Sequence, residues 1–100
     1  MHDDSTYVKY ASLKMGLLED AHAMKILYAL AKEGATAKTV LYSSISTSNR
    51  TLADRIRDLT DAELIEEIAT EKYPYRALQL TEKGKKVAEH VEAIERVLNR

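Results

Sequence analysis

The sequence contains no cysteine, tryptophan or phenylalanine, and it has one proline and three glycines. Without cysteine the chain cannot form disulfides, use a thiolate as a nucleophile or redox sensor, or bind zinc through sulfur ligands. The aromatic residues are six tyrosines. They do not alternate with basic residues in the pattern that favours stacking on single-stranded RNA, so that class of partner is not indicated.

Long apolar runs are also missing, so no segment of the sequence has the composition of a membrane span. The first ten residues, MHDDSTYVKY, lack the basic-then-apolar order of a signal peptide. We therefore expect a cytoplasmic protein. The formal net charge is −1, so any binding to nucleic acid must come from locally concentrated positive charge.

What is present is typical of a globular protein. The 100 residues are 45% hydrophobic and 31% charged, which predicts one domain over 1–100. A chain of this length can bury one core but has a thin margin of stability, and dimerisation would increase it.

The first third of the chain predicts helices. Residues 1–6 are expected to fray. Tyrosines and leucines at helical spacing predict a short helix within 7–20. Asp20 is a candidate N-cap for a stronger helix over 21–33, and Gly34 follows as its C-terminal stop.

A third short helix is predicted over 37–44, with Thr36 as its cap and a turn at 44–47. Next comes an amphipathic helix, predicted over 47–60 with Thr47 or Ser46 as its cap. One face of this helix is apolar and the opposite face is charged. The apolar residues are Leu52, Ile56 and Leu59, and the charged residues are Arg50, Asp54 and Arg57.

The periodicity then changes from 3.6 to 2. LIEEIAT (64–70) and ALQLT (77–81) predict two strands of a β-hairpin joined by a polar loop. Thr81 is the expected cap of a final helix that runs to residue 100. Two helices joined by a short turn and followed by a hairpin predict an α+β winged helix-turn-helix fold, with a three-helix core, a two-stranded β-hairpin wing and a long C-terminal helix.

We divide this predicted domain into three parts. Residues 1–18 form an N-terminal extension, 20–80 the winged helix-turn-helix, and 81–100 the C-terminal helix, which we expect to mediate dimerisation.

Residues 45–87 resemble the winged-helix transcriptional regulators of the HxlR type and, more loosely, of the MarR type. In these families Ser-x-Lys-Thr-Leu opens the recognition helix, Arg-Leu-x-x-Leu continues it, Gly-Leu-Ile/Val enters the wing and Leu-Thr-x-x-Gly follows it. The matching residues here are Ser48, Arg50, Thr51, Leu52, Arg55, Ile56, Leu59, Leu64, Ile65, Leu80, Thr81 and Gly84. The resemblance implies the winged-helix fold and binding to duplex DNA.

The sequence departs from the family pattern at three points. Glu63 stands where the pattern has glycine, so either Glu63 adopts a positive φ at a cost of roughly 1 kcal/mol or the turn differs. Glu66 and Glu67 occupy positions where basic residues would favour a phosphate. The thiol-based sensing of some family members is excluded because there is no cysteine.

The resemblance implies that the start of the 47–60 helix enters the major groove. Arginine can bond to guanine and asparagine to adenine, while hydroxyls and the helix N-terminus suit phosphates. The alternative is a solvated helix face with ion pairs from Asp54 to Arg50 and to Arg57. The candidate DNA-contacting residues on this helix are Ser48, Asn49, Arg50, Thr51, Asp54 and Arg57.

The loop at 70–76 is the candidate wing tip. Lys72, Tyr73 and Arg76 are its candidate contacts to the DNA backbone or the minor groove, and further lysines follow at 83, 85 and 86. An ordinary solvated loop is the alternative.

Four apolar residues of the last helix are spaced 4, 3, 4, like a coiled-coil seam. They are Val87, Val91, Ile94 and Leu98. We expect this seam to pack against a second copy of the chain, with the apolar stretch 7–18 as a candidate second half of the interface. The alternative is that the seam packs on the chain's own first helices.

The function expected from these features is that of a homodimeric, sequence-selective regulator of transcription that binds double-stranded DNA. A winged-helix protein-interaction module without DNA contact is the alternative, favoured by the near-neutral charge and by the acidic pair Glu66 and Glu67. The sequence shows no catalytic constellation, phosphate loop or metal-ligand spacing, so neither an enzyme nor a cofactor is expected. Whether a small-molecule effector exists is left open.

Overall fold

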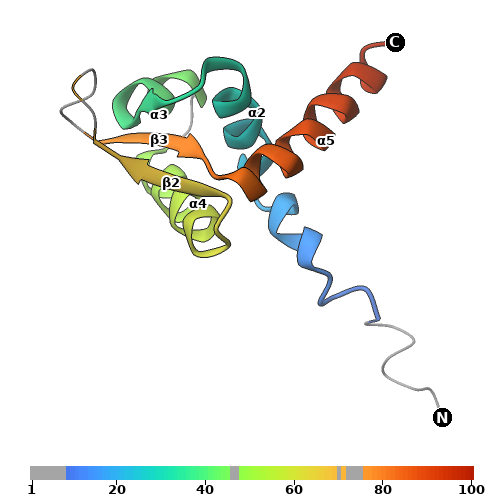
Figure 1. The fold of residues 1–100 in the computed structure, drawn as a ribbon. Helices are drawn as coiled ribbons and strands as arrows, with labels where there is room; N and C mark the ends of the chain where they lie inside the picture. Colours follow the sequence, from blue (N-terminus) through green and yellow to red (C-terminus); the bar gives the residue numbers. More distant parts are fainter. Residues whose placement is uncertain (1–8, 46–47, 70, 72–75) are drawn as a thin grey trace.

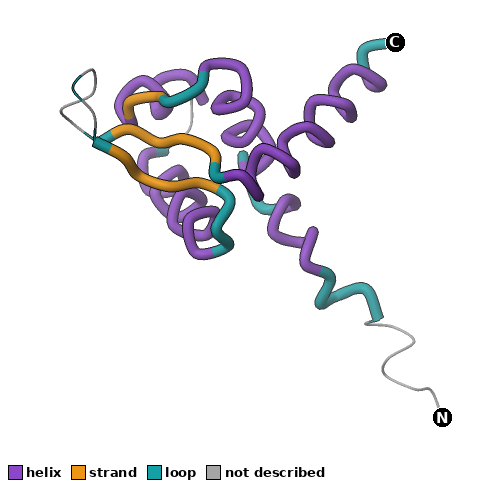
Figure 2. Tube along the Cα trace, viewed as in Figure 1, coloured by secondary structure: helices purple, strands orange, loops and turns teal. Residues whose placement is uncertain are grey.

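A computed structural model of the chain describes residues 9–45, 48–69, 71 and 76–100. Figures 1 and 2 show its helices, a small sheet and a C-terminal helix that projects from the rest of the fold. The elements in chain order are the 3-10 helix η1 (Lys14–Glu19), α2 (Ala23–Glu33), β1 (Thr36–Ala37), α3 (Lys38–Ile45), α4 (Asn49–Asp61), β2 (Ile65–Ile68), β3 (Ala77–Leu80) and α5 (Glu82–Leu98). The predicted winged helix-turn-helix architecture is confirmed, with α3 and α4 as the helix pair and β2–β3 as the hairpin.

The sheet has one strand more than the sequence predicts. β1 pairs antiparallel with β3, and β3 pairs antiparallel with β2, so the strand order is β1-β3-β2. Thr36, predicted as a helix cap, lies in β1 opposite Leu78, and its hydroxyl donates to the Gly34 carbonyl oxygen. A strand of two residues is too short to show a period of 2, which is why the pattern did not reveal it.

The core lies between the helices and one face of the sheet. Its largest fully buried side chains come from α2, α3, α4, β2 and β3, and α5 packs against α2 and β3. These side chains are Ile26, Leu27, Leu30, Leu41, Leu52, Leu59, Ile65 and Leu78. The predicted apolar face of α4 is confirmed, because Leu52, Ile56 and Leu59 are all buried.

The start of α2 differs from the prediction. Its N-cap is His22, in the left-handed region with φ 69°, while Asp20 ends η1. The Asp20 carbonyl oxygen accepts from the Ala23 N–H at 3.1 Å, and the Asp20 side chain bonds elsewhere. The predicted C-terminal stop at Gly34 is confirmed by its φ of 75° and by its N–H, which donates to the Leu30 carbonyl oxygen.

The turn from α4 into β2 contains Glu63 at the position where the family pattern has glycine. Glu63 takes a left-handed φ of 62°. Its N–H donates to the Thr60 carbonyl oxygen, and the N–H of Leu64 donates to that of Leu59. This is a Schellman motif, which normally favours glycine at the left-handed position. Of the two alternatives that the sequence left open for this turn, the structure has the positive φ at Glu63, and Leu64 continues directly into the core.

The same turn fixes the start of α5. The Thr81 side chain caps the helix by accepting from the Gly84 N–H, as predicted, and its hydroxyl donates to the Glu63 carbonyl oxygen at 2.6 Å. A Cβ on Gly84 would lie 1.8 Å from the Leu64 carbonyl oxygen. Glycine is required here because the backbones of α5 and the turn touch.

Candidate nucleic-acid interface

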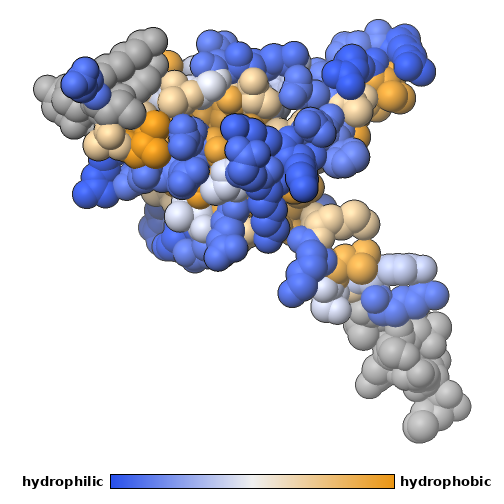
Figure 3. Space-filling view, viewed as in Figure 1, coloured by the Kyte–Doolittle hydropathy of each residue, from blue (hydrophilic) through white to orange (hydrophobic). Residues whose placement is uncertain are grey.

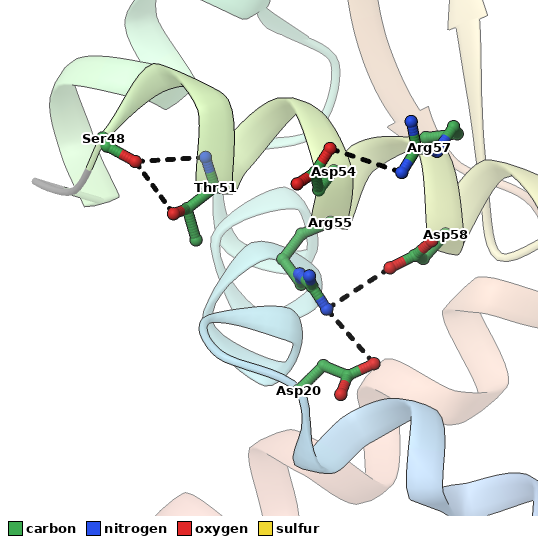
Figure 4. Close-up of polar contacts among 7 residues, drawn as sticks. All are labelled: Asp20, Ser48, Thr51, Asp54, Arg55, Arg57 and Asp58. Atoms are coloured by element: carbon green, nitrogen blue, oxygen red, sulfur yellow. Dashed lines mark hydrogen bonds and ion pairs between the residues drawn. The ribbon is translucent and has the colours of Figure 1, made fainter.

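The N-terminal end of α4 is exposed while its buried face anchors it to the core. Ser48 is the N-cap, so the predicted cap at Ser46 or Thr47 is wrong in position; those two residues themselves lie outside the described part of the chain. The Ser48 hydroxyl oxygen accepts from the Thr51 N–H at 3.1 Å and its proton is donated to the Thr51 hydroxyl at 2.8 Å (Figure 4). The cap thus occupies Ser48 and leaves the proton of the Thr51 hydroxyl free to donate to an anion.

Asn49 and Arg50 form the exposed first turn of α4. Within the described residues, neither side chain makes a hydrogen bond or ion pair. The helix N-terminus adds a partial positive charge at the same place. This end of α4 therefore combines a guanidinium, an amide and oriented backbone N–H groups on solvent-facing surface.

Further along the same outer face, Arg57 Nη2 bonds to Asp54 Oδ1 at 3.3 Å, and both side chains remain accessible (Figure 4). This is one of the two ion pairs expected for a solvated helix face. The other, between Asp54 and Arg50, does not form in the structure. Exposed pairs at this spacing are weak, so Arg57 can exchange its partner at low cost.

Arg55 lies on the side of α4 that faces the start of the chain. Its Nη1 is 3.1 Å from Asp20 Oδ2 and 3.3 Å from Asp58 Oδ2, and its side chain is only 19% exposed (Figure 4). Arg55 therefore holds α4 against the segment between η1 and α2. The sequence indicated Arg55 only as a residue that matches the family pattern. Its ion pair could not be predicted, because Asp20 lies far away along the chain.

The predicted wing falls partly outside the described residues. Lys72 and Tyr73 lie in the part of the chain that the structure does not describe. Arg76 is described and immediately precedes β3, where its Nη1 bonds to Glu67 Oε2 at 2.7 Å. Two of the lysines that follow make contacts within the chain. Lys83 donates to the Ala62 carbonyl oxygen, and Lys85 pairs with Glu82.

Glu67 forms ion pairs with two basic residues, Arg76 and Lys38, and the sequence had not indicated Lys38 as part of the site. Lys38, the first residue of α3, bonds to Glu67 Oε1, while Arg76 holds the other oxygen. Hydrogen bonds from Lys38 and then from Arg76 lower the pKa of the Glu67 carboxyl below its ordinary value. The glutamate that appeared unfavourable for phosphate binding is thus ion-paired to two basic residues at the base of the wing.

The predicted seam of α5 divides into two halves. Val91 is buried and Val87 packs partly against the core of its own chain. Ile94 and Leu98 are exposed, together with Val97. Figure 3 shows apolar residues at this projecting end of the helix. Ile94 and Leu98 also line a groove of about 550 Å³ with Met24, Tyr28 and Ile45.

No helix within the described residues has both the length and the apolar composition needed to cross a membrane. Within the same residues, no group of three or more metal-ligating side chains comes together.

Comparison with known proteins identifies the fold and the family. The structure superposes on a possible HxlR family transcriptional factor from Thermoplasma volcanium GSS1 with a TM-score of 0.79 and 25% identity, covering 90% of this chain and 82% of that one. A MarR family transcriptional regulator from Silicibacter pomeroyi DSS-3 superposes with a TM-score of 0.67 and 16% identity, covering 94% and 62%.

The reduced form of the transcriptional regulator YodB from B. subtilis superposes with a TM-score of 0.67 and 21% identity, covering 95% and 89%. No curated protein matches the sequence. The model of the HxlR-like helix-turn-helix family matches residues 17–100. With that match extending over most of its length, and with the helix pair, hairpin and capped turns described above, the chain belongs to the HxlR-like helix-turn-helix family.

Proposed function

We propose that this protein is a sequence-selective regulator of transcription that binds duplex DNA as a homodimer. The observation that carries the proposal is the geometry of α4. One face is fixed in the core, the N-terminus is capped, and Asn49 and Arg50 are exposed beside it. In helix-turn-helix proteins this end of the second helix contacts base edges in the major groove. Acting on DNA, such a regulator would work in the cytoplasm.

The residues of α4 take different parts in this proposal. Arg50 and Asn49 read base edges, because their side chains can each form two hydrogen bonds to one base. Thr51 donates to a phosphate, and Arg57 exchanges Asp54 for the DNA backbone. Ser48 contributes by capping the helix, which stabilises the N-terminal end that faces the ligand.

The 70–76 segment is proposed to contact the backbone or the minor groove beside α4. Lys72 and Tyr73 remain sequence-based candidates, and Arg76 is supported by its position at the base of the hairpin. Arginine, lysine and tyrosine can all donate to phosphate oxygens.

The second half of α5 is proposed as the main dimer contact. Ile94, Val97 and Leu98 expose apolar surface on a helix end that projects away from the sheet (Figure 1). Adjacent exposed apolar residues favour association, and most soluble oligomers are two-fold symmetric. Tyr10 and Met15, exposed in and before η1, are candidates for the second half of the interface.

Selection from a randomised duplex pool at two salt concentrations tests the proposal. A DNA-binding dimer should enrich a roughly palindromic site and lose it as salt rises, because binding to phosphates releases counterions. The R50A variant should enrich that site less strongly and relax the preference at one base position. R100A is the matched control, since it removes the same charge just beyond the C-terminal end of α5.

A protein-interaction module is the second candidate function. It is favoured by the pairing of Lys38 and Arg76 with Glu67, which reduces the basic surface available to DNA. Failure to enrich any duplex at low salt would select this candidate over the DNA-binding one.

A further inference from the structure

The base of the wing contains an ion-paired cluster drawn from three strand ends. Lys38 follows β1 and opens α3, Glu67 lies in β2, and Arg76 precedes β3. The backbone N–H of Lys38 donates to the Arg76 carbonyl oxygen at 3.3 Å, which holds the two basic residues side by side. Both oxygens of the single carboxylate are engaged, one with each cation.

The cations are reachable from solvent although they are paired. The Arg76 side chain is 75% exposed, whereas that of Glu67 is 31% exposed. A phosphate oxygen can therefore approach the guanidinium from the solvent side and compete there with the carboxylate for its N–H groups. Exposed ion pairs contribute little to stability, so exchanging the carboxylate for a phosphate lowers the free energy of unfolding only slightly.

We infer that Glu67 sets the strength of backbone binding by competing with DNA phosphates for Lys38 and Arg76. This inference rests on the proposed function. Bound DNA must displace the carboxylate from the two cations and then tolerate its negative charge close to a phosphate. Glu67 thereby holds non-specific affinity low and leaves a larger share of the binding energy to the base contacts of α4.

The substitution Glu67→Gln removes the charge and keeps the shape. Binding to a 30-base-pair duplex of arbitrary sequence should tighten about fivefold at low salt. The slope of log affinity against log salt should steepen by about 1 to 2, since each newly contacted phosphate adds about 0.9. A purely structural role for Glu67 would not steepen this slope.

Glu66→Gln is the matched control. Glu66 is the neighbouring residue of β2 and accepts a hydrogen bond from Gln79 at 3.3 Å; within the described residues it contacts no cation. Both substitutions remove one negative charge, so their difference isolates the competition for the two basic residues. Circular dichroism of each variant confirms that it is folded.

Removing the cations provides a second measurement. In a chain that carries Lys38→Met and Arg76→Gln, adding Glu67→Gln should change affinity no more than adding Glu66→Gln. A persistent difference would overturn the inference, because Glu67 would then act through other groups.

The outcomes separate this inference from the proposed function. If the parent binds duplex DNA and E67Q behaves like E66Q, or binds more weakly, Glu67 does not compete and the proposed function stands. If the parent binds no duplex at low salt, the proposed function fails and the inference fails with it.

Discussion

Arg55 of α4 and Asp20, at the end of η1, form an ion pair of 3.1 Å that joins segments 35 positions apart in the chain. The same guanidinium also reaches Asp58 on its own helix. Because the Arg55 side chain is largely buried, it positions α4 relative to the segment that leads into α2. The end of α4 that we propose to enter DNA is thus oriented partly by a residue that itself stays out of the interface.

The substitution Arg55→Met should lower the free energy of unfolding by about 1 kcal/mol, because it leaves the Asp20 and Asp58 carboxylates without their shared partner. Urea denaturation measures this change. Arg57→Met is the matched control on the same helix, since it breaks only the exposed pair with Asp54 and should cost less than about 0.5 kcal/mol. Equal losses in the two variants would show that the Asp20 contact does not stabilise the fold.

The left-handed residue Glu63 carries a strain that glycine would relieve. Glu63→Gly should raise the free energy of unfolding by up to about 1 kcal/mol. Asp61→Gly is the control, because Asp61 ends α4 with helical geometry and loses the same charge. That variant should be destabilised by about 0.5 to 1 kcal/mol. If E63G were less stable than the parent, the left-handed φ of Glu63 would not be a source of strain.

Arg50 is the residue on which specific binding should depend most. Arg50→Ala should weaken binding to the selected site by about 1 to 3 kcal/mol and relax the preference at one base position. Fluorescence anisotropy with the selected duplex and single-base variants measures both effects. Unchanged affinity and preference in R50A would assign base reading to another side chain.

The oligomeric state should respond to substitutions at the projecting end of α5. Val97→Asp should shift a dimer toward monomer, measured by sedimentation equilibrium, because it places a charge in a proposed apolar contact. Val40→Asp on α3 is a close control, since the two valines are 56% and 55% exposed. A V97D protein that keeps the mass of the parent dimer would place the interface elsewhere.

The acid dependence of stability should include a contribution from Glu67. Its carboxyl has a lowered pKa in the folded chain, first through Lys38 and then through Arg76. The ion pairs therefore stabilise the fold above the ordinary glutamate pKa of about 4.3, and this stabilisation is lost as the pH falls through the lower folded value.

Urea denaturation of the parent and E67Q across this pH range tests the sign. The parent should be slightly the more stable at neutral pH, by less than about 1 kcal/mol, and the difference should shrink on acidification. E66Q is measured alongside as the control for losing one charge. If the stability difference between the parent and E67Q grew at acid pH, the pKa of Glu67 would be raised in the folded chain and not lowered.

Much of the fold follows from patterns that are local in the sequence. The apolar spacing of Leu52, Ile56 and Leu59 fixes a buried helix face. The end of α2 at Gly34 follows from backbone geometry, and the start of α5 at Thr81 follows from hydroxyl capping. For residue 63 the family pattern left two alternatives, a positive φ or a different turn, and the structure has the positive φ. Each of these depends on residues within a few positions of one another.

Contacts between distant residues could not be predicted in the same way. The strand β1 exists because β3 offers it a partner some 40 residues later, and its two residues have no periodic signature. The pairing of Glu67 with Lys38 likewise brings together segments that share no local pattern. The acidic run at 66–67 therefore appeared to be a plain obstacle to phosphate binding.

The sequence alone thus determined which faces are apolar, where the helices lie to within a few residues, and which family pattern the chain follows, because these depend on short-range backbone and hydrophobic preferences. The tertiary structure decided which charged side chains are free and which are held. It pairs Lys38 and Arg76 with Glu67, turns Arg55 inward and leaves Arg50 exposed, because the partners of charged side chains are set by how distant segments pack.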